Sequence, residues 1–488
     1  MEGSPRKLIW GVPSCFTMLS DLWITIAHLL IISMTLQVLT ASAPATVEVG
    51  SDGEHMLTED DPALLASPIE IGYFTTKTLQ AAVRLWCMPR TKHDALRKYG
   101  PISEWNTSRV TNMFSLFYEF CSTRSTFNDD ISGWQVSRVQ EMSYMFHKCI
   151  RFNQDLTRWD VSSVTNMEGM FQSASAFDHP LNTWNISRVT SLQNTFRNAR
   201  SFDKSLSRWD VSSVTNMRSI FWGASKFNRP MSRWRTSNVV DMQAMFVDAI
   251  AFNQGIGEWD VSAVKNMYGM FWGAKRFNKN ISSWNVSNVE NMGNMFSYAE
   301  AFNQPLSSWN VERVENMHGI FSYAKAFNRD ISLWKFTSLT SLYGFFRGAS
   351  AYNRPLKNWN VSKIENMRYT FADASSFSQD IGDWDVSRVR NMEGMLQGTR
   401  AFNSDVSRWD VSRVTEMGYL FAFSTTFNQP LASWNVQRVS SMRYLFSGAA
   451  AFNQRKSEKK FFLLFTHLSL ITLIEQCSSR KLGRFRSE

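Results

Sequence analysis

The chain has 488 residues, of which 44% are hydrophobic and 14% aromatic, including 19 tryptophans and 37 phenylalanines. This composition supplies enough apolar material for a continuous core and excludes disorder over most of the length. The formal net charge is +10, but residues 455–488 alone hold eight lysines and arginines against three acids. Because no basic run in the central region interleaves with aromatic residues along the sequence, we predict no nucleic-acid partner.

Residues 1–43 have the features of a secretory signal. Arg6 and Lys7 precede residues 22–39, which carry no formal charge, and Thr-Ala-Ser-Ala follows at 40–43. That order is typical of a signal peptide. The uncharged stretch is also nearly long enough to span a bilayer, so a retained signal-anchor is an alternative, and a buried helix is a third. We therefore expect an extracellular or cell-surface location, with membrane attachment through this segment if it is retained.

Two short regions come next, an exposed linker at 44–72 and a helical N-terminal cap at 73–104. The linker contains Glu59, Asp60 and Asp61 among several small residues. In the cap region, Thr76 is placed to cap a helix. Four apolar residues then share one helical face and predict a surface that covers the region that follows: Leu79, Ala82, Val83 and Trp86.

A 25-residue unit recurs about fourteen times across residues 105–454. It reads W-D/N-V-S-x-V-T-N-M-x-x-M-F-x-x-A-x-x-F-N-x-x-L-x-x, and from the second tryptophan onward every interval between tryptophans is 25. The tryptophans that define the units stand at 105, 134, 159, 184, 209, 234, 259, 284, 309, 334, 359, 384, 409 and 434. A repeat with this regularity predicts stacked units without insertions.

Each unit is predicted to contain a short strand and then a short helix or irregular coil. In the unit that begins at Trp159, Val161, Val164 and Met167 recur every three residues among Ser and Thr, which favours a short strand entered through a turn. Asp160, or Asn in other units, is expected to bond to local backbone. The spacings of three and four that follow indicate a helix with one apolar face: Met167, Met170, Phe171, Ala174 and Phe177.

A unit of this size cannot bury its own apolar face, but stacked units bury a ladder of Met, Phe and Trp. The sequence therefore predicts a solenoid similar to leucine-rich repeats. A recurring asparagine is expected to bond to backbone between neighbouring coils: Asn166, Asn216, Asn266, Asn291, Asn316, Asn366 and Asn391. Calcium binding by the aspartates that follow Trp is the less favoured interpretation, because Arg235 and Lys335 replace the acid in two units.

The five cysteines are too few and too scattered for a disulfide framework or a zinc site. Cys121 and Cys149 flank the one irregular interval between tryptophans and are predicted to pair in an oxidising compartment. Cys149 also stands where most units have Ala, so a small buried residue is the alternative. The seven histidines recur in no column, and no phosphate loop or nucleophile elbow is present, so we predict no enzyme, no metal and no cofactor.

Two sets of surface residues are candidate sites. The first lies six residues after Trp, where the side chain varies between units, and predicts a contact surface that includes Thr165, Thr190, Val240, Lys265, Glu290, Glu315, Glu365 and Arg390. The second consists of sequons for N-glycosylation, which also arise when the repeat changes W-D-V-S to W-N-V-S: Asn106, Asn185, Asn280, Asn285 and Asn360.

The unit W-D-V-S-x-V-T-N-M-x-x-M-F-x-x-A-x-x-F-N resembles that of the BspA-like leucine-rich-repeat surface proteins, in the 25-residue class of mycoplasma surface lipoproteins and of algal and protist proteins. Residues 79–86 and 99–105 look like the entry segment of that family. The resemblance implies a solenoid displayed at a surface, often linked to adhesion, with no catalytic residue to carry over.

The pattern stops mid-unit after Gln454, and residues 455–488 form a basic and then apolar tail. A read-through or gene-model error, a short membrane-associated segment and a divergent cap are all compatible with it. For the whole chain we predict a non-enzymatic surface or secreted protein that binds a protein or glycan at a cell surface. The alternative is a structural or intracellular scaffold without a specific ligand.

Overall fold

The computed structural model describes residues 72–121 and 127–453. Its helices are α3 (Thr76–Cys87), α4 (Lys92–Tyr99) and α5 (Tyr118–Cys121), with the 3-10 helix η2 (Ile102–Glu104) between the last two. The chain divides into two units, Met1–Asp61 and Pro62–Glu488, and every described residue belongs to the second. The predicted signal, nearly all of the predicted linker and the tail lie outside the described residues. Within the described ranges, no helix is long and apolar enough to cross a membrane.

Helix α3 begins with a capping box one residue earlier than the sequence predicts. Thr75, not Thr76, is the N-cap, because the side chains of Thr75 and Thr78 each accept the backbone N–H of the other. Thr75 N donates to Thr78 Oγ1 at 2.9 Å and Thr78 N donates to Thr75 Oγ1 at 3.4 Å. The predicted apolar face is buried, and the rings of Trp86 and Trp105 lie 5.6 Å apart. This helix therefore packs on the tryptophan of the first repeat.

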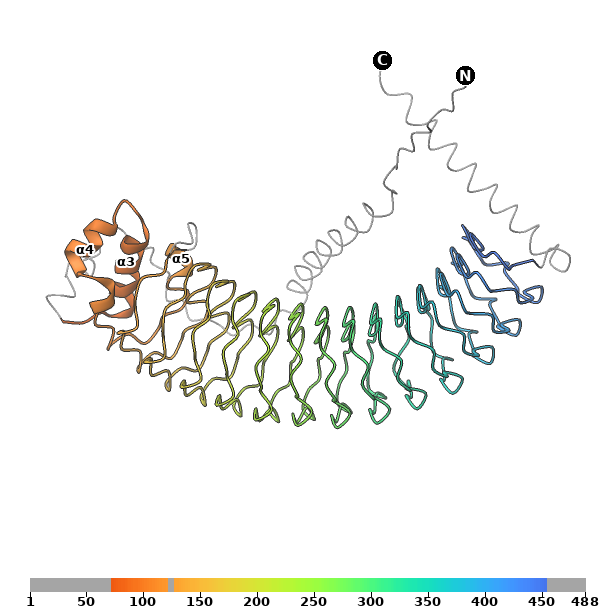
Figure 1. Cartoon of the computed structure of the whole chain (residues 1–488), viewed down its shortest axis with the longest axis horizontal. Helices are drawn as coiled ribbons and strands as arrows, with labels where there is room; N and C mark the ends of the chain where they lie inside the picture. Colours follow the sequence, from red (N-terminus) through yellow and green to blue (C-terminus); the bar gives the residue numbers. More distant parts are fainter. Residues whose placement is uncertain (1–71, 122–126, 454–488) are drawn as a thin grey trace, which may run out of the picture. The chain divides into compact units, whose positions relative to one another are not determined.

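The repeats form coils that lie side by side in chain order (Figure 1). Neighbouring coils pair through single parallel bridges at the residue seven after Trp, as in Glu141 with Asn166 and Asn166 with Ser191. The predicted strand around Val161 is therefore wrong in extent, because only one residue per unit pairs in this way. The described repeats form a solenoid of turns and isolated bridges.

From Trp134 onward the predicted helix is also absent, because two residues in each of these units have left-handed backbone. They lie ten and fourteen residues after Trp, as with Gly169 (φ 59°) and Ser173 (φ 60°). A left-handed residue every fourth position ends any α-helix. Consecutive tight turns replace it, with Met170 N donating to Met167 O at 3.2 Å and Ala174 N to Phe171 O at 3.0 Å. These turns keep the apolar residues on one side, so the spacing of three and four persists without a helix.

The amides that point out of these turns bond to the next coil. Tyr144 N donates to Glu168 O at 2.7 Å, Phe146 N to Met170 O at 2.9 Å and Lys148 N to Gln172 O at 2.8 Å. The other amides of the segment bond within their own unit. Because both sets are satisfied, the backbone can be packed closely without unpaired polar groups.

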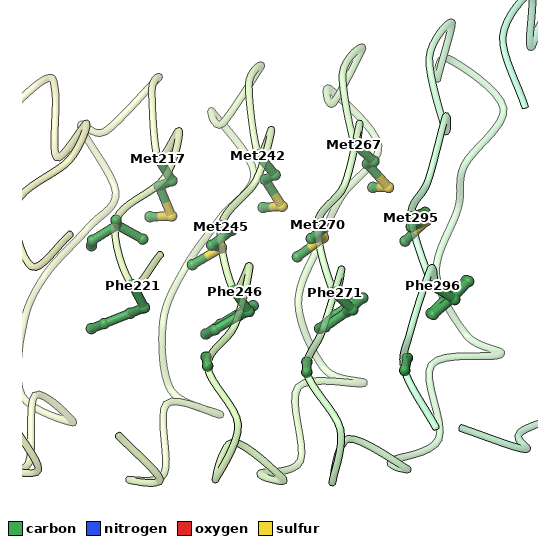
Figure 2. Packing of buried hydrophobic residues seen from close by; sticks show 14 of the residues in the cluster. Met217, Phe221, Met242, Met245, Phe246, Met267, Met270, Phe271, Met295 and Phe296 are labelled. Atoms are coloured by element: carbon green, nitrogen blue, oxygen red, sulfur yellow. The ribbon is translucent and has the colours of Figure 1, made fainter. Parts of the chain in front are cut away.

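The core consists of identical side chains stacked in register. Figure 2 shows the columns of Met and Phe, and the ring centroids of Phe246, Phe271 and Phe296 are 5.7 Å apart at each step. Trp234 and Trp259 stack at 6.0 Å with an interplanar angle of 5°. Each fully buried side chain of this size contributes roughly 1.5–3 kcal/mol, and only stacking removes these residues from water.

Each tryptophan also makes a hydrogen bond that phenylalanine cannot make. Trp259 Nε1 donates to Met231 O at 3.0 Å in the preceding coil, and the same carbonyl accepts Trp234 N at 3.0 Å. The same bond links Trp284 Nε1 to Ile256 O. Since a buried indole N–H needs a partner, this carbonyl explains why Trp begins every unit.

The predicted asparagine column does bond between coils, but to side chains and not to backbone. Asn166 Nδ2 donates to Glu141 Oε2 at 3.0 Å and Asn216 Nδ2 to Gln193 Oε1 at 2.9 Å, while Asn166 Oδ1 accepts Glu168 N at 3.0 Å in its own unit. The inter-coil ladder of bonds from backbone to side chain uses the Asn or Asp that follows the second Phe: Asn253 N donates to Asn228 Oδ1 at 2.9 Å and Asn278 N to Asn253 Oδ1 at 3.0 Å. The sequence signal for it was the recurring Phe-Asn pair.

The predicted disulfide between Cys121 and Cys149 is wrong. Cys121 pairs with Cys87, with Cα atoms 5.0 Å apart, and the bond joins the end of α3 to α5. Cys149 is free and buried, and burial raises the pKa of its thiol to about 12. It occupies the Ala column inside the core, so the alternative interpretation of Cys149 as a small buried residue is confirmed.

Candidate binding surface

Four positions of each unit whose side chains differ between units lie on one surface, which we call the variable face. It comprises the residues 9, 10, 13 and 14 positions after each repeat tryptophan. These positions alternate along the turns with buried Met and Phe, so their side chains point away from the core. The inter-coil backbone bonds hold them at fixed spacing.

The composition of the variable face is unlike that of the rest of the chain. It holds nine of the twelve tyrosines: Tyr118, Tyr144, Tyr268, Tyr298, Tyr323, Tyr343, Tyr369, Tyr419 and Tyr444. Its other residues are mainly Gly, Ser, Arg and Gln, with Trp222 and Trp272, and its only lysine is Lys148. Interfaces of proteins are enriched in Tyr, Trp and Arg and depleted in Lys, and antibody paratopes combine Tyr with Ser, Gly and Asn.

Several of these rings occupy strained backbone positions. The residues 10 and 14 after Trp are left-handed in every unit from Trp134 onward, and glycine takes many of them. Aromatic residues take others despite a cost of about 1–2 kcal/mol each for a left-handed L-residue: Tyr144, Tyr298, Tyr323, Tyr369, Tyr419, Phe423 and Tyr444. Other units have Gly at the same positions, so stability alone does not explain why these units have an aromatic ring there.

Glycine in the following unit makes room for four of these rings, those of Tyr144, Tyr323, Tyr369 and Phe423, whereas Tyr298 and Tyr419 stack on the tyrosine of the next unit. A Cβ atom on Gly169 would lie 2.5 Å from Cε1 of Tyr144, and the ring of Tyr369 similarly occupies the space above Gly394. The rings therefore lie along the face and lean toward the next coil. Tyr298 and Tyr444 remain 38% and 61% exposed, which leaves ring surface open to a partner.

In the C-terminal half of the array the rings alternate with guanidinium groups. Tyr298 and Tyr323 stack at 4.6 Å, and the guanidinium of Arg347 lies 5.7 Å from the ring of Tyr323 and 5.1 Å from that of Tyr369. Arg368 lies 4.8 Å from the same Tyr369 ring. We call this row the Tyr–Arg ladder.

Glu393 neutralises two of the arginines in this region. Arg368 Nε lies 3.0 Å from Glu393 Oε2, and Arg443 reaches across a whole unit to bond Glu393 Oε1 at 3.1 Å. Gly418 lies between them, and a Cβ there would approach Cγ of Arg443 at 3.1 Å. The hydrogen bond to Glu393 raises the pKa of Arg443. This carboxylate is almost buried, so it acts as an internal counter-ion.

The N-terminal half of the face has a different polar network. Tyr144 Oη donates to Glu168 Oε1 at 2.5 Å, and Gln193 Nε2 donates to the same oxygen at 2.7 Å. Burial, and then the bond to Glu168, raises the pKa of Tyr144. Farther along, the guanidinium of Arg197 lies 4.1 Å from the ring of Trp222. Aromatic and charged groups are thus in contact along most of the face.

Comparison with protein families decides the classification. The family described as "Mycoplasma protein of unknown function, DUF285" matches at residues 90–208, 190–308, 254–357, 281–384 and 340–460, and together these matches cover the entire array. The chain belongs to this family. No curated protein matches the chain.

One solved structure similar to this DUF285 protein is "Crystal structure of TLR13-ssRNA13 complex", at 10% sequence identity and a TM-score of 0.20. The similarity covers 74% of this chain and 66% of that one, so less than two thirds of the other chain is spanned. At this TM-score the comparison supports no argument about ligand or mechanism.

The contact column predicted from the sequence borders the variable face in the DUF285 array. All of its predicted members are exposed. Neighbours of opposite charge approach one another, with Lys265 Nζ 3.8 Å from Glu290 Oε1 and Arg390 Nε 3.6 Å from Glu365 Oε2. The column holds no aromatic residue, and its role in binding stays a prediction. Sequence reasoning missed the adjacent face, although nine of the ten tyrosines in the repeats stand at its four positions, which was a usable signal.

The five sequon asparagines are exposed and lie outside the variable face. In Asn185, Asn285 and Asn360 the Oδ1 accepts the backbone amide two residues later, which leaves the glycosylated nitrogen free of that turn. Asn106 differs, because its Nδ2 donates to Gly72 O at 2.6 Å. Their modification stays a prediction.

The described part of the array offers few features of a pocket or a metal site. A hollow of about 270 Å³ lies near its C-terminal end and is lined by polar residues: Ser412, Arg413, Asn435, Gln437 and Arg438. Across residues 72–121 and 127–453, no three His, Cys, Asp or Glu side chains are grouped so that they could hold a metal ion. The aspartates after Trp bond to local backbone as predicted, as in Asp160 Oδ1 with Ser162 N at 3.1 Å.

Proposed function

We propose that this chain is a non-enzymatic binding protein that contacts a protein partner through the variable face. The observation that carries the proposal is the concentration of nine of the twelve tyrosines on this one surface of the array. Tyrosine provides a large contact area with few rotatable bonds, so little conformational entropy is lost on binding. Ser, Gly and Asn between the rings supply hydrogen bonds and close approach.

The rigidity of the solenoid supports this function. The rings are attached to a backbone whose amides bond within and between coils, so the face is largely formed before a partner arrives. Preformed surfaces lose less free energy to ordering and bind more tightly for a given area. A leucine-rich-repeat-like, BspA-like adhesion protein is the finer form of this proposal.

Display outside the cell is a further part of the proposal. It is supported by the uncharged residues 22–39 after Arg6 and Lys7, and by exposed sequons that leave the variable face clear. Expression in a eukaryotic secretory host, followed by glycosidase digestion, fractionation and N-terminal sequencing, tests it. A glycosylated product outside the cell supports display, and a start near Ala45 rather than Met1 indicates secretion over anchoring. An unglycosylated cytosolic product favours the scaffold.

The binding function is tested with two sets of variants against an array of purified ectodomains. The ring set combines Tyr298→Gly, Tyr323→Gly and Tyr369→Ser, which are residue types that the same left-handed positions already accept elsewhere in the array. The matched charge set reverses Glu290, Glu315 and Glu365 in the neighbouring column. Both sets must first show the wild-type melting temperature.

Loss of at least tenfold in affinity with the ring set, and less than threefold with the charge set, is the expected result, because aromatic anchors dominate interface energies. Loss with the charge set alone would move the contact surface to the column six residues after Trp. Unchanged binding by both sets, or no ectodomain bound at all, would contradict the proposed function.

A further inference from the structure

The repeat that begins at Trp334 differs from its neighbours on the variable face. Both of its left-handed positions are glycine, Gly344 and Gly348. Both glycines are buried, and the ring of Tyr323 lies over Gly348. Arg347 stands between them in the sequence, and it is the one arginine of the Tyr–Arg ladder with rings of two other units beside its guanidinium.

That arginine, Arg347, has an unpaired N–H group in its side chain. Its guanidinium is flanked by Tyr323 at 5.7 Å and Tyr369 at 5.1 Å. Its Nε is buried and has no hydrogen-bond partner among the described residues. A buried N–H group without an acceptor is costly, so no bond within the described chain offsets the partial burial of this guanidinium.

The nearby acids do not neutralise it. Glu393 is already held by Arg368 and Arg443. The charge of Arg347 acts on Asp373, but the two side chains form no salt bridge in the described structure, and burial raises the pKa of Asp373. Arg347 is therefore a partly desolvated cation that lies between two tyrosine rings and has no close counter-ion.

We propose that Arg347 anchors a carboxylate from an extended acidic segment of a protein partner. The inference rests on the proposed function and names its partner chemistry. A guanidinium offers two parallel N–H groups that match the two oxygens of Asp or Glu, and flanking rings that exclude water strengthen such a bond.

The test uses a phage-displayed library of random 12-residue peptides selected on the immobilised full chain. Selected peptides are synthesised with each acid in turn changed to its amide, and affinities are measured by fluorescence anisotropy. The variants are Arg347→Met, which keeps the length of the side chain, Arg347→Lys, which keeps only the charge, and Tyr369→Ser. The matched control is Arg388→Met, since Arg388 is an exposed cation on a different side of the coil.

The expected result is an enrichment of Asp or Glu at one peptide position. Arg347→Met and the matching amide peptide should each lower affinity at least tenfold, and the two changes together should lower it little further. Arg347→Lys should fall between Arg347→Met and wild type, and Arg388→Met should stay within twofold. If Arg347→Met does not fold, the amide peptide and Arg347→Lys still decide the question.

Peptides without a shared acid, or an unchanged affinity for Arg347→Met, would overturn the carboxylate anchor. Such peptides would still support the proposed function if Tyr323→Gly and Tyr369→Ser weaken them. Peptides insensitive to every change on the variable face, or a library without binders, would count against both.

Discussion

Replacing Tyr352 with phenylalanine is expected to stabilise the array. Tyr352 takes the place of the second Phe of the unit and stacks between Phe327 and Phe377, with ring centroids at 5.9 and 6.5 Å. Its hydroxyl is buried and has no hydrogen-bond partner among the described residues, and burial raises its pKa well above the ordinary value. The substitution deletes one oxygen and leaves the ring stack unchanged.

The size of the effect follows from the environment of that oxygen. A buried hydroxyl without a partner costs about 1–3 kcal/mol, because its bonds to water are lost on folding. Phenylalanine restores the side chain of the neighbouring units and leaves only a small void, so Tyr352→Phe should raise the free energy of unfolding by about 1 kcal/mol. The control, Phe377→Tyr in the next unit, places the same oxygen in the same column and should lower stability by a similar amount.

The assay is urea unfolding followed by tryptophan fluorescence, with the midpoints compared at equal slopes. Equal slopes matter because repeat arrays can lose units without unfolding as a whole. A lower midpoint for Tyr352→Phe would show that the hydroxyl has a stabilising partner. It would refute the account of this column as strictly apolar.

Three further predictions concern polar contacts. Ser378→Asn should raise the urea midpoint, by about 0.5–1.5 kcal/mol in stability, because it supplies the side-chain acceptor for Asn403 N that is missing at this one step of the ladder. Burial lowers the pKa of His147 from 6.5 to about 4, so as the pH falls the unfolded chain binds a proton before the folded chain does. The free energy of unfolding should therefore decrease as the pH falls from 6.5 to about 4, and His147→Gln should flatten this pH dependence in urea titrations. Reducing the disulfide between Cys87 and Cys121, separated by 34 residues, should destabilise the cap by about 3–4 kcal/mol, measured as earlier loss of helical circular dichroism.

The architecture was predictable where one residue type fills a column. The spacing of Trp, Met and Phe revealed the unit, its stacking and most of its core, since identical units can bury these side chains only against one another. The conformation inside the unit was not predictable from that spacing, because consecutive tight turns place apolar residues on one side as a helix does. The alternation of Gly169 with Asn194 and Ser219 at one position was the sign of left-handed backbone.

The binding surface was harder to predict for a physical reason. The residue after Val164 and its equivalents changes charge from unit to unit, which is easily noticed in the sequence. The variable face instead has Gly in some units and Tyr in others, which does not suggest a contact surface. Tyrosine is uncommon at left-handed positions, so the spacing of the repeat gave no reason to single out Tyr369 and Tyr419. Only the register between coils shows that Arg347 lies between rings from two other units.

The most direct test of the central claim is hydroxyl-radical footprinting of the full chain with and without a partner selected as above. The account predicts that oxidation falls at Tyr298, Tyr323 and Tyr369, while Leu333, which is 68% exposed outside the variable face, reacts at an unchanged rate. Protection of Leu333 without protection of the three tyrosines would contradict the assignment of the variable face as the contact surface.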